Sequence, residues 1–160
     1  MEIVKATLTE LDEIMSIYKY AREFMAAHGN PNQWKNINPT REMIIDDINN
    51  QKLNLCLDSG RIACVFYYNE GDDPTYNVID GEWLNSEPYG VVHRIASAPN
   101  TKGAATFSLT YAFNKCKNLK IDTHDDNIPM QNLLNKLGFK FCGIITLANG
   151  EPRRAYQKIN

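Results

Sequence analysis

The sequence of 160 residues lacks the features that mark disulfide scaffolds and metal sites. It has four cysteines and three histidines, no C-x-x-C pair, and histidines that lie far apart. We therefore expect neither a disulfide framework nor a bound metal. The cysteines fall inside apolar strand or helix patterns, which predicts small core residues in a reducing cytoplasm. They are Cys56, Cys64, Cys116 and Cys142.

Excess positive charge and long apolar runs are also missing. Lys and Arg total 17 against 19 for Asp and Glu, a net charge of −2, and no basic stripe is present. Nucleic acid is therefore not expected as a partner. The apolar runs are too short to span a bilayer, and the first residues lack a signal-peptide pattern, so we expect a cytoplasmic protein without a membrane partner. Neither G-x-G-x-x-G nor G-x-x-x-x-G-K-[ST] occurs, which makes a nucleotide-binding α/β protein a remote alternative.

What is present predicts one α/β domain over residues 1–160. Apolar periodicity predicts helices over 11–27, from 38–40 onward, over 104–117 and over 128–137. Alternating and β-branched runs predict strands over 2–7, 53–58, 61–68, 90–98, 119–123, 139–147 and 153–159. The order is β-α-α-β-β-β-α-β-α-β-β. It favours a mixed, twisted central sheet with helices on both faces.

The segment from 95 to 106 joins a predicted strand to a predicted helix through small residues. Gly103, Ala104 and Ala105 carry almost no side chain at the start of that helix. A helix N-terminus presents unpaired amides and partial positive charge, so a phosphate can approach it closely. The alternative is an ordinary tight connection between strand and helix.

Two polar loops hold large aromatic residues. Trp34 follows the first helix, and it either covers another element or lines a small-molecule pocket. The segment 69–89 is long and irregular yet contains Tyr76, Trp83 and Tyr89. It therefore reads either as a loop facing a substrate or as packing over the sheet.

Three motifs, in this order, resemble the GNAT superfamily of N-acetyltransferases. The segment N-T-K-G-A-A at 100–105 resembles the family's Q/R-x-x-G-x-G/A pyrophosphate loop. Asn127 opens the next predicted helix, and N-K-L-G-F at 135–139 is similar to the family's Y-x-K-x-G-F ending. Two positions depart from the family: Asn100 replaces Gln or Arg, and Leu134 stands where a general-acid tyrosine is frequent.

The resemblance implies a V-shaped opening between the strands at 90–98 and 119–123, with acetyl-CoA lying in it. The pantetheine arm would pair with strand backbone, and the pyrophosphate would sit on loop and helix amides. Lys102 would either screen the phosphates or remain solvated. The implied cofactor residues are Ile95, Ala96, Ser97, Lys102, Gly103, Ala104, Ala105, Thr106 and Asn127.

The chemistry implied by this family needs a base for the amine. Strand alternation places His93 on one face with Tyr89, Val91 and Ile95, where it could accept a proton, while a buried structural histidine is the alternative. Arg94 would lie on the opposite face, paired with a carboxylate such as Asp122. The further catalytic candidates are Glu82 as a base and Tyr156 as a replacement acid. The candidate substrate-binding residues are Trp34, Tyr67 and Trp83, which suit an acceptor with an apolar body and a cationic amine.

The resulting hypothesis is an acetyl-CoA-dependent N-acetyltransferase that acts on a primary amine of a small molecule or a protein. The alternative is a catalytically lapsed domain that binds acyl-CoA as a sensor or interaction module, because Leu134 cannot transfer a proton. Strand edges in this family's architecture also allow a homodimer.

Overall fold

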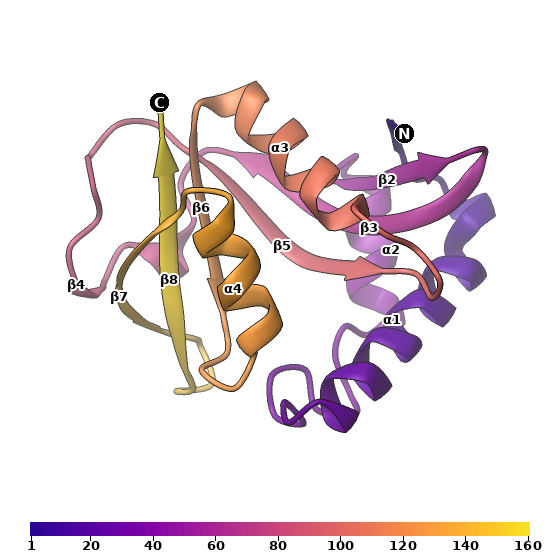
Figure 1. The fold of residues 1–160 in the computed structure, drawn as a ribbon, viewed down its shortest axis with the longest axis horizontal. Helices are drawn as coiled ribbons and strands as arrows, with labels where there is room; N and C mark the ends of the chain where they lie inside the picture. Colours follow the sequence, from indigo (N-terminus) through magenta and orange to yellow (C-terminus); the bar gives the residue numbers. More distant parts are fainter.

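The chain folds around one eight-stranded sheet that carries helices on both faces (Figure 1). The computed structural model describes residues 1–160. The strands are β1 (Glu2–Lys5), β2 (Leu53–Asp58), β3 (Arg61–Glu70), β4 (Asp80–Gly81), β5 (Gly90–Ser97), β6 (Asn118–Thr123), β7 (Lys140–Thr146) and β8 (Pro152–Ile159). The helices are α1 (Leu11–Ala27), α2 (Arg41–Asn49), α3 (Ala104–Cys116) and α4 (Ile128–Lys136), with single 3₁₀ turns at Leu8–Glu10 and Pro74–Tyr76.

The strands lie in the order β1-β2-β3-β5-β6-β8-β7-β4. Only β5 and β6 run parallel, and every other neighbouring pair is antiparallel. The helix α3 joins the two parallel strands, as a parallel crossover requires. The predicted mixed sheet and element order are therefore confirmed, with β4 as an additional strand.

Each face of the sheet packs against its own pair of helices. On one face, Ile14 of α1 and Ile44 of α2 belong to a core cluster with Leu55 and Val65 of the sheet. On the other face, Leu109 of α3 and Leu134 of α4 are buried with Phe66 and Val92. Figure 1 shows α3 crossing the near side of the sheet while α2 lies behind it. Adjacent residues such as Val65 and Phe66 point to opposite faces because side chains alternate along a strand.

The hairpin of β2 and β3 follows directly from the turn between them. Ser59 and Gly60 both adopt positive φ, at 53° and 79°. Two consecutive residues of this kind form the tight turn whose twist matches that of paired strands. The predicted hairpin is confirmed, and β3 extends two residues further, to Glu70.

The short strand β4 was not predicted, because it depends on a contact distant in sequence. Gly81 pairs with Gly143 of β7, and a Cβ atom at Gly81 would collide with the carbonyl oxygen of Cys142. The glycine therefore permits a close approach of two backbones. This contact anchors the middle of the long 69–89 segment to the edge of the sheet.

No helix has both the length and the apolar character that crossing a bilayer requires. All four cysteines are unpaired thiols. Cys56, Cys64 and Cys142 are buried, which confirms their expected place in the core.

Candidate active site

The parallel strands β5 and β6 separate after a short paired stretch. Their register includes only Gly90 with Leu119 and Val91 with Lys120. Beyond Val91, β5 stays paired with β3 alone, so its other edge carries unpaired backbone groups. Figure 1 shows the two strands leaving a common region and diverging. The V-shaped opening implied by the sequence resemblance is present.

A β-bulge lies where β5 departs from β6. Tyr67 of β3 faces His93, and Val65 faces Ala96, so one residue of β3 lies opposite two residues of β5. Arg94, inside the bulge, has a φ of 50°. Such an extra residue bends a strand and resets its side-chain alternation.

Because of the bulge, the prediction of which β5 side chains share a face was wrong. Arg94 stacks on the ring of Tyr67 with 4.6 Å between the guanidinium carbon and the ring centroid, and the His93 ring lies 5.6 Å from the same centroid. His93 and Arg94 therefore share a face, although alternation had placed them on opposite faces. Ile95 instead packs with the α3 and α4 core and does not share the face of His93.

The partner predicted for Arg94 was also wrong. Its Nε and Nη2 atoms donate to the two carboxylate oxygens of Asp47 on α2, at 2.8 and 2.9 Å. Burial raises the pKa of Asp47, and the Arg94 charge opposes that effect. Asp122, the carboxylate expected to pair with Arg94, therefore interacts with other residues.

A groove of about 310 Å³ runs along the open edge of β5. One wall is formed by β5 and the start of α3, and the other by the C-terminal half of α1 and by α4. The predicted cofactor residues Ile95, Ala96, Ser97, Ala105 and Asn127 line it. Asn127 also caps α4, because its side-chain oxygen accepts a hydrogen bond from the Met130 amide at 3.2 Å.

The start of α3 leaves amides without side-chain partners at one end of this groove. Gly103 is the N-cap with a φ of 79° and supplies no capping side chain. The next three amides, those of Ala104, Ala105 and Thr106, have no intrahelical acceptor. Lys102 is exposed beside them. This geometry can hold an anion.

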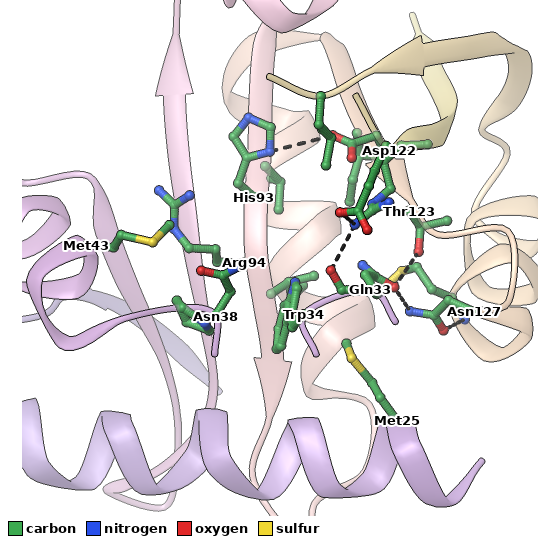
Figure 2. A pocket seen from close by; sticks show the side chains of 18 of the residues that line it. Met25, Gln33, Trp34, Asn38, Met43, His93, Arg94, Asp122, Thr123 and Asn127 are labelled. Atoms are coloured by element: carbon green, nitrogen blue, oxygen red, sulfur yellow. Dashed lines mark hydrogen bonds and ion pairs between the residues drawn. The ribbon is translucent and has the colours of Figure 1, made fainter. Parts of the chain in front are cut away.

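A second cavity, of about 220 Å³, continues from the groove into the V-shaped opening. Met25, Ile95, Asn127 and Met130 line both spaces, so the two are contiguous. Met43 and Arg94 lie on one side of this cavity, Asp122 and Asn127 lie on the other, and Trp34 lies between them (Figure 2). A ligand in the groove could therefore meet a second molecule in the cavity.

His93 is held between two carboxylates in this cavity. Its Nε2 lies 2.7 Å from Asp73 Oδ2, and its Nδ1 lies 3.7 Å from Asp122 Oδ1. Asp122 Oδ1 also accepts a hydrogen bond from the buried Tyr76 hydroxyl at 2.6 Å. The hydrogen bond from His93 lowers the pKa of Asp73. With the Nε2 proton directed at Asp73, Nδ1 is the nitrogen that can accept a proton from the cavity side.

Gln33 connects the loop after α1 to the rest of the cavity. Its side-chain oxygen accepts hydrogen bonds from Asn127 at 2.8 Å and from Thr123 at 3.4 Å (Figure 2). Its backbone carbonyl accepts one from Arg153 of β8 at 2.8 Å. Sequence reasoning missed Gln33, Arg153 and Asp73, because each acts through a partner that is distant along the chain.

Several residues singled out from the sequence do not line the cavity. Trp34 does line it, but Tyr67 and Trp83 do not. The Trp83 indole donates to the Tyr76 carbonyl at 2.9 Å and packs on the 69–89 segment. Glu82 is exposed, outside the cavity lining. From this long segment, it is Asp73 and Tyr76 that reach the cavity residues His93 and Asp122.

The two acid positions considered from the sequence are both buried. Tyr156 is 1% exposed, on the α3 and α4 face, and it lies outside the cavity lining. Its hydroxyl accepts a hydrogen bond from Arg154 Nε at 3.2 Å. Leu134 is fully buried in the same core. Neither residue presents a proton donor to the cavity.

The fold and the groove together define an acetyltransferase architecture, and comparison with solved structures supports this class. A GNAT-family acetyltransferase from Streptococcus agalactiae superposes with a TM-score of 0.90 at 34% identity, over 99% of this chain and 95% of that one. A ribosomal-protein-alanine N-acetyltransferase from Brucella melitensis gives 0.69 at 16% identity over the full length of both chains. A protein from Salmonella typhimurium, classed as an acetyltransferase and solved with its cofactor acetyl-CoA, gives 0.64 at 13% over 99% and 94%.

The last two similarities show the fold alone, whereas the first also shows kinship in sequence. A scan against protein-family models and a search of curated proteins each found no match. The chain belongs to the GNAT family of acetyltransferases.

Proposed function

We propose that this protein transfers the acetyl group of acetyl-CoA to a primary amine. The observation that carries the proposal is the continuous path from the start of α3, along the free edge of β5, into the cavity beside His93. One end of the path suits a phosphate and the other suits a reacting amine. The thioester would lie where the groove and the cavity meet.

The groove residues have distinct roles in this proposal. The pyrophosphate binds the amides of Lys102, Gly103, Ala104, Ala105 and Thr106 at the positive end of α3. The pantetheine arm pairs with the free backbone edge at Ile95, Ala96 and Ser97, in the manner of an added strand. Asn127 has a side-chain N–H left after its bond to Gln33, and this group can meet the pantetheine amides.

The reaction requires a neutral amine beside the thioester carbonyl. His93 Nδ1 accepts the amine proton, and Asp73 stabilises the charged imidazole that results. The amine nitrogen, which still carries two hydrogens, then bonds to the carbonyl carbon, the carbon–sulfur bond breaks, the thiolate of CoA leaves, and the nitrogen gives its second proton to water. Because no tyrosine lines the cavity, the thiolate takes its proton from water or from the protonated His93. Holding both substrates in contiguous sites supplies much of the acceleration.

The second candidate is a domain that binds acyl-CoA without turning it over. The burial of Leu134 favours it, because no proton donor stands at the position where many relatives of this family carry one. Such a domain would use the groove identically and would leave His93 without a catalytic task.

Calorimetric titration with acetyl-CoA tests both candidates through an Ala105→Glu variant. Ala105 lines the groove in the first turn of α3, where an acidic side chain is favourable for the helix but repels a phosphate. We expect saturable binding by the wild type and at least a roughly 100-fold loss in the variant. Thr110→Glu adds the same charge at an exposed position further along α3, outside the groove, and should bind normally.

The outcomes separate the candidates. If the folded wild type does not bind acetyl-CoA, both candidate functions are refuted. Binding followed by thiol release with an amine supports the enzyme, and a His93→Ala variant should then lose turnover while it keeps acetyl-CoA binding. Binding without turnover on any amine supports the acyl-CoA-binding module.

A further inference from the structure

The cavity beside His93 contains a buried arginine that no carboxylate fully neutralises. Arg153 is 4% exposed and lines the cavity. Its Nη1 donates to the Pro152 carbonyl at 2.9 Å, and its Nη2 to the Gln33 carbonyl at 2.8 Å. A guanidinium has five N–H donors, so three remain without a protein acceptor.

The nearest acidic group to Arg153 is already engaged. Glu151 Oε2 lies 3.8 Å from Arg153 Nη2. The same carboxylate lies 3.2 Å from Lys35 Nζ and accepts a hydrogen bond from Asn149 at 2.7 Å. The single negative charge of Glu151 therefore has two positive neighbours, Lys35 and Arg153.

Arg94, the other arginine in the wall, differs because Asp47 binds it through two hydrogen bonds. A buried charge without a close partner is costly, unless a ligand supplies the opposite charge. The molecule that enters the cavity is therefore expected to carry an anionic group that pairs with Arg153.

Arg153 and Asp122 face the same side of the sheet. Asp122 of β6 lies opposite Ala155 of β8, and Arg153 is two residues from Ala155 on the same face. Two residues span about 7 Å along a strand, which leaves room between the two charged groups for a short molecule with opposite charges at its ends. The cavity volume of about 220 Å³ also lies below the ~300–1,000 Å³ typical of pockets for drug-sized ligands.

We infer that the acceptor is a small amino acid-like molecule: its carboxylate binds Arg153 and its amine lies between Asp122 and His93. The inference rests on the proposed acetyltransferase function and narrows its substrate class. A protein amine is disfavoured, because a lysine side chain has no free carboxylate a few bonds away, and a chain N-terminus has one only where its first residue is Asp or Glu.

The reaction balances for such a substrate. The ammonium form first gives one proton to solvent or to His93, and the neutral amine attacks the thioester. After the carbon–sulfur bond breaks, the products are the N-acetylated amino acid, CoA with a protonated thiol, and one released proton. Asp122 holds the ammonium form, and Arg153 fixes the carboxylate away from the reacting centre.

The test compares three forms of each acceptor: the free amino acid, its carboxamide and its decarboxylated amine, with CoA thiol release as the readout. In the wild type, kcat/KM for the free acid should exceed that for the carboxamide at least tenfold. Arg153→Gln should lower kcat/KM for the acid at least tenfold, mainly through KM, and should change the carboxamide less than threefold. The preference for acids would then disappear.

Matched variants keep this test decisive. Arg154→Gln removes a guanidinium from the next residue of β8, which faces the other side of the sheet, and should retain the preference for acids. Arg153→Lys keeps the charge without the fork of donors and should retain part of the preference. Unchanged acetyl-CoA binding by calorimetry shows that the Arg153 variants are folded.

Two results overturn the inference while the proposed function survives. One is equal turnover of acids, carboxamides and decarboxylated amines by the wild type. The other is an equal loss for all three forms in Arg153→Gln. If no amine at all is turned over, thermal unfolding in the presence of CoA and millimolar free amino acids still tests the inference. An increase in Tm with free amino acids that is absent in the Arg153→Gln variant supports it. No increase in Tm in the wild type refutes it.

Discussion

Replacing Asp73 with asparagine tests whether His93 acts as the base of the reaction. The asparagine would keep the size of the side chain and still offer an oxygen to His93 Nε2, which now lies 2.7 Å from Asp73 Oδ2. What disappears is the negative charge that stabilises the imidazole when it takes up the amine proton. We expect kcat to fall about 10- to 100-fold, less than most of the ~10²–10⁴-fold that positioned acid–base catalysis contributes, because His93 itself is retained. KM for acetyl-CoA should not change, because Asp73 lies outside the groove.

The same substitution has a calculable effect on stability. A hydrogen bond to a charged group contributes about 1.5–3 kcal/mol and a neutral one about 0.5–1.5 kcal/mol, so the loss is about 1 kcal/mol. For a chain of this size that corresponds to a decrease in Tm of about 2–4 °C. The hydrogen bond from His93 lowers the pKa of Asp73 below its ordinary value of 3.8. The stabilisation is therefore complete above pH 3.8 and is lost as pH falls through the lower folded pKa. As pH falls from 3.8 to the folded pKa of Asp73, the free energy of unfolding should decrease more steeply in the wild type than in the variant.

The assay is steady-state thiol release at saturating acetyl-CoA, together with thermal melts from pH 3 to pH 8. Asp72→Asn serves as the control, because Asp72 is the exposed neighbour and makes no bond to His93. If Asp73→Asn loses no more activity than Asp72→Asn, the carboxylate does not support the base, and His93 is a structural residue.

Two further substitutions test the surroundings of the cavity. Arg94→Gln leaves the Asp47 carboxylate, whose side chain is 10% exposed, without its partner, and should lower the free energy of unfolding by about 3 kcal/mol. Urea denaturation measures this loss, and a double variant with Asp47→Asn should recover more than half of it; no recovery would mean that Arg94 stabilises the fold through its stacking on Tyr67. Leu134→Tyr forces a larger, polar side chain into a site with no exposed surface, and should cost about 1–3 kcal/mol of stability without raising kcat. An increase in kcat at unchanged Tm would show instead that a tyrosine here reaches the leaving thiol.

Much of the fold could be predicted because it depends on local patterns. The alternation of Leu53, Leu55 and Leu57 and the Ser59–Gly60 turn predict the β2–β3 hairpin without any distant contact. The small residues between β5 and α3 likewise predict a helix start that an anion can approach. The groove is thus the part of the site that the sequence indicates most directly.

The cavity could not be predicted in the same way. The expected faces of β5 assumed unbroken alternation, but the bulge at Arg94 places His93 and Arg94 on one side. The expected base from the 69–89 segment was Glu82, which is exposed, whereas Asp73 of the same segment bonds to His93. Many acidic residues lie in that segment, and nothing in their spacing distinguishes one from another.

Local patterns in the sequence are enough to predict the order of elements, the two helical layers and the small-residue loop at the start of α3, because periodicity and turn chemistry act over a few residues. The set of side chains that share the cavity depends instead on long-range packing. Gln33, Asp73, Asp122 and Arg153 come from four separate segments, and their roles arise from hydrogen bonds to partners that include residues 46 to 120 positions away. Contacts of that range depend on strand order, on the bulge in β5 and on the separation of β5 from β6, which no local pattern encodes.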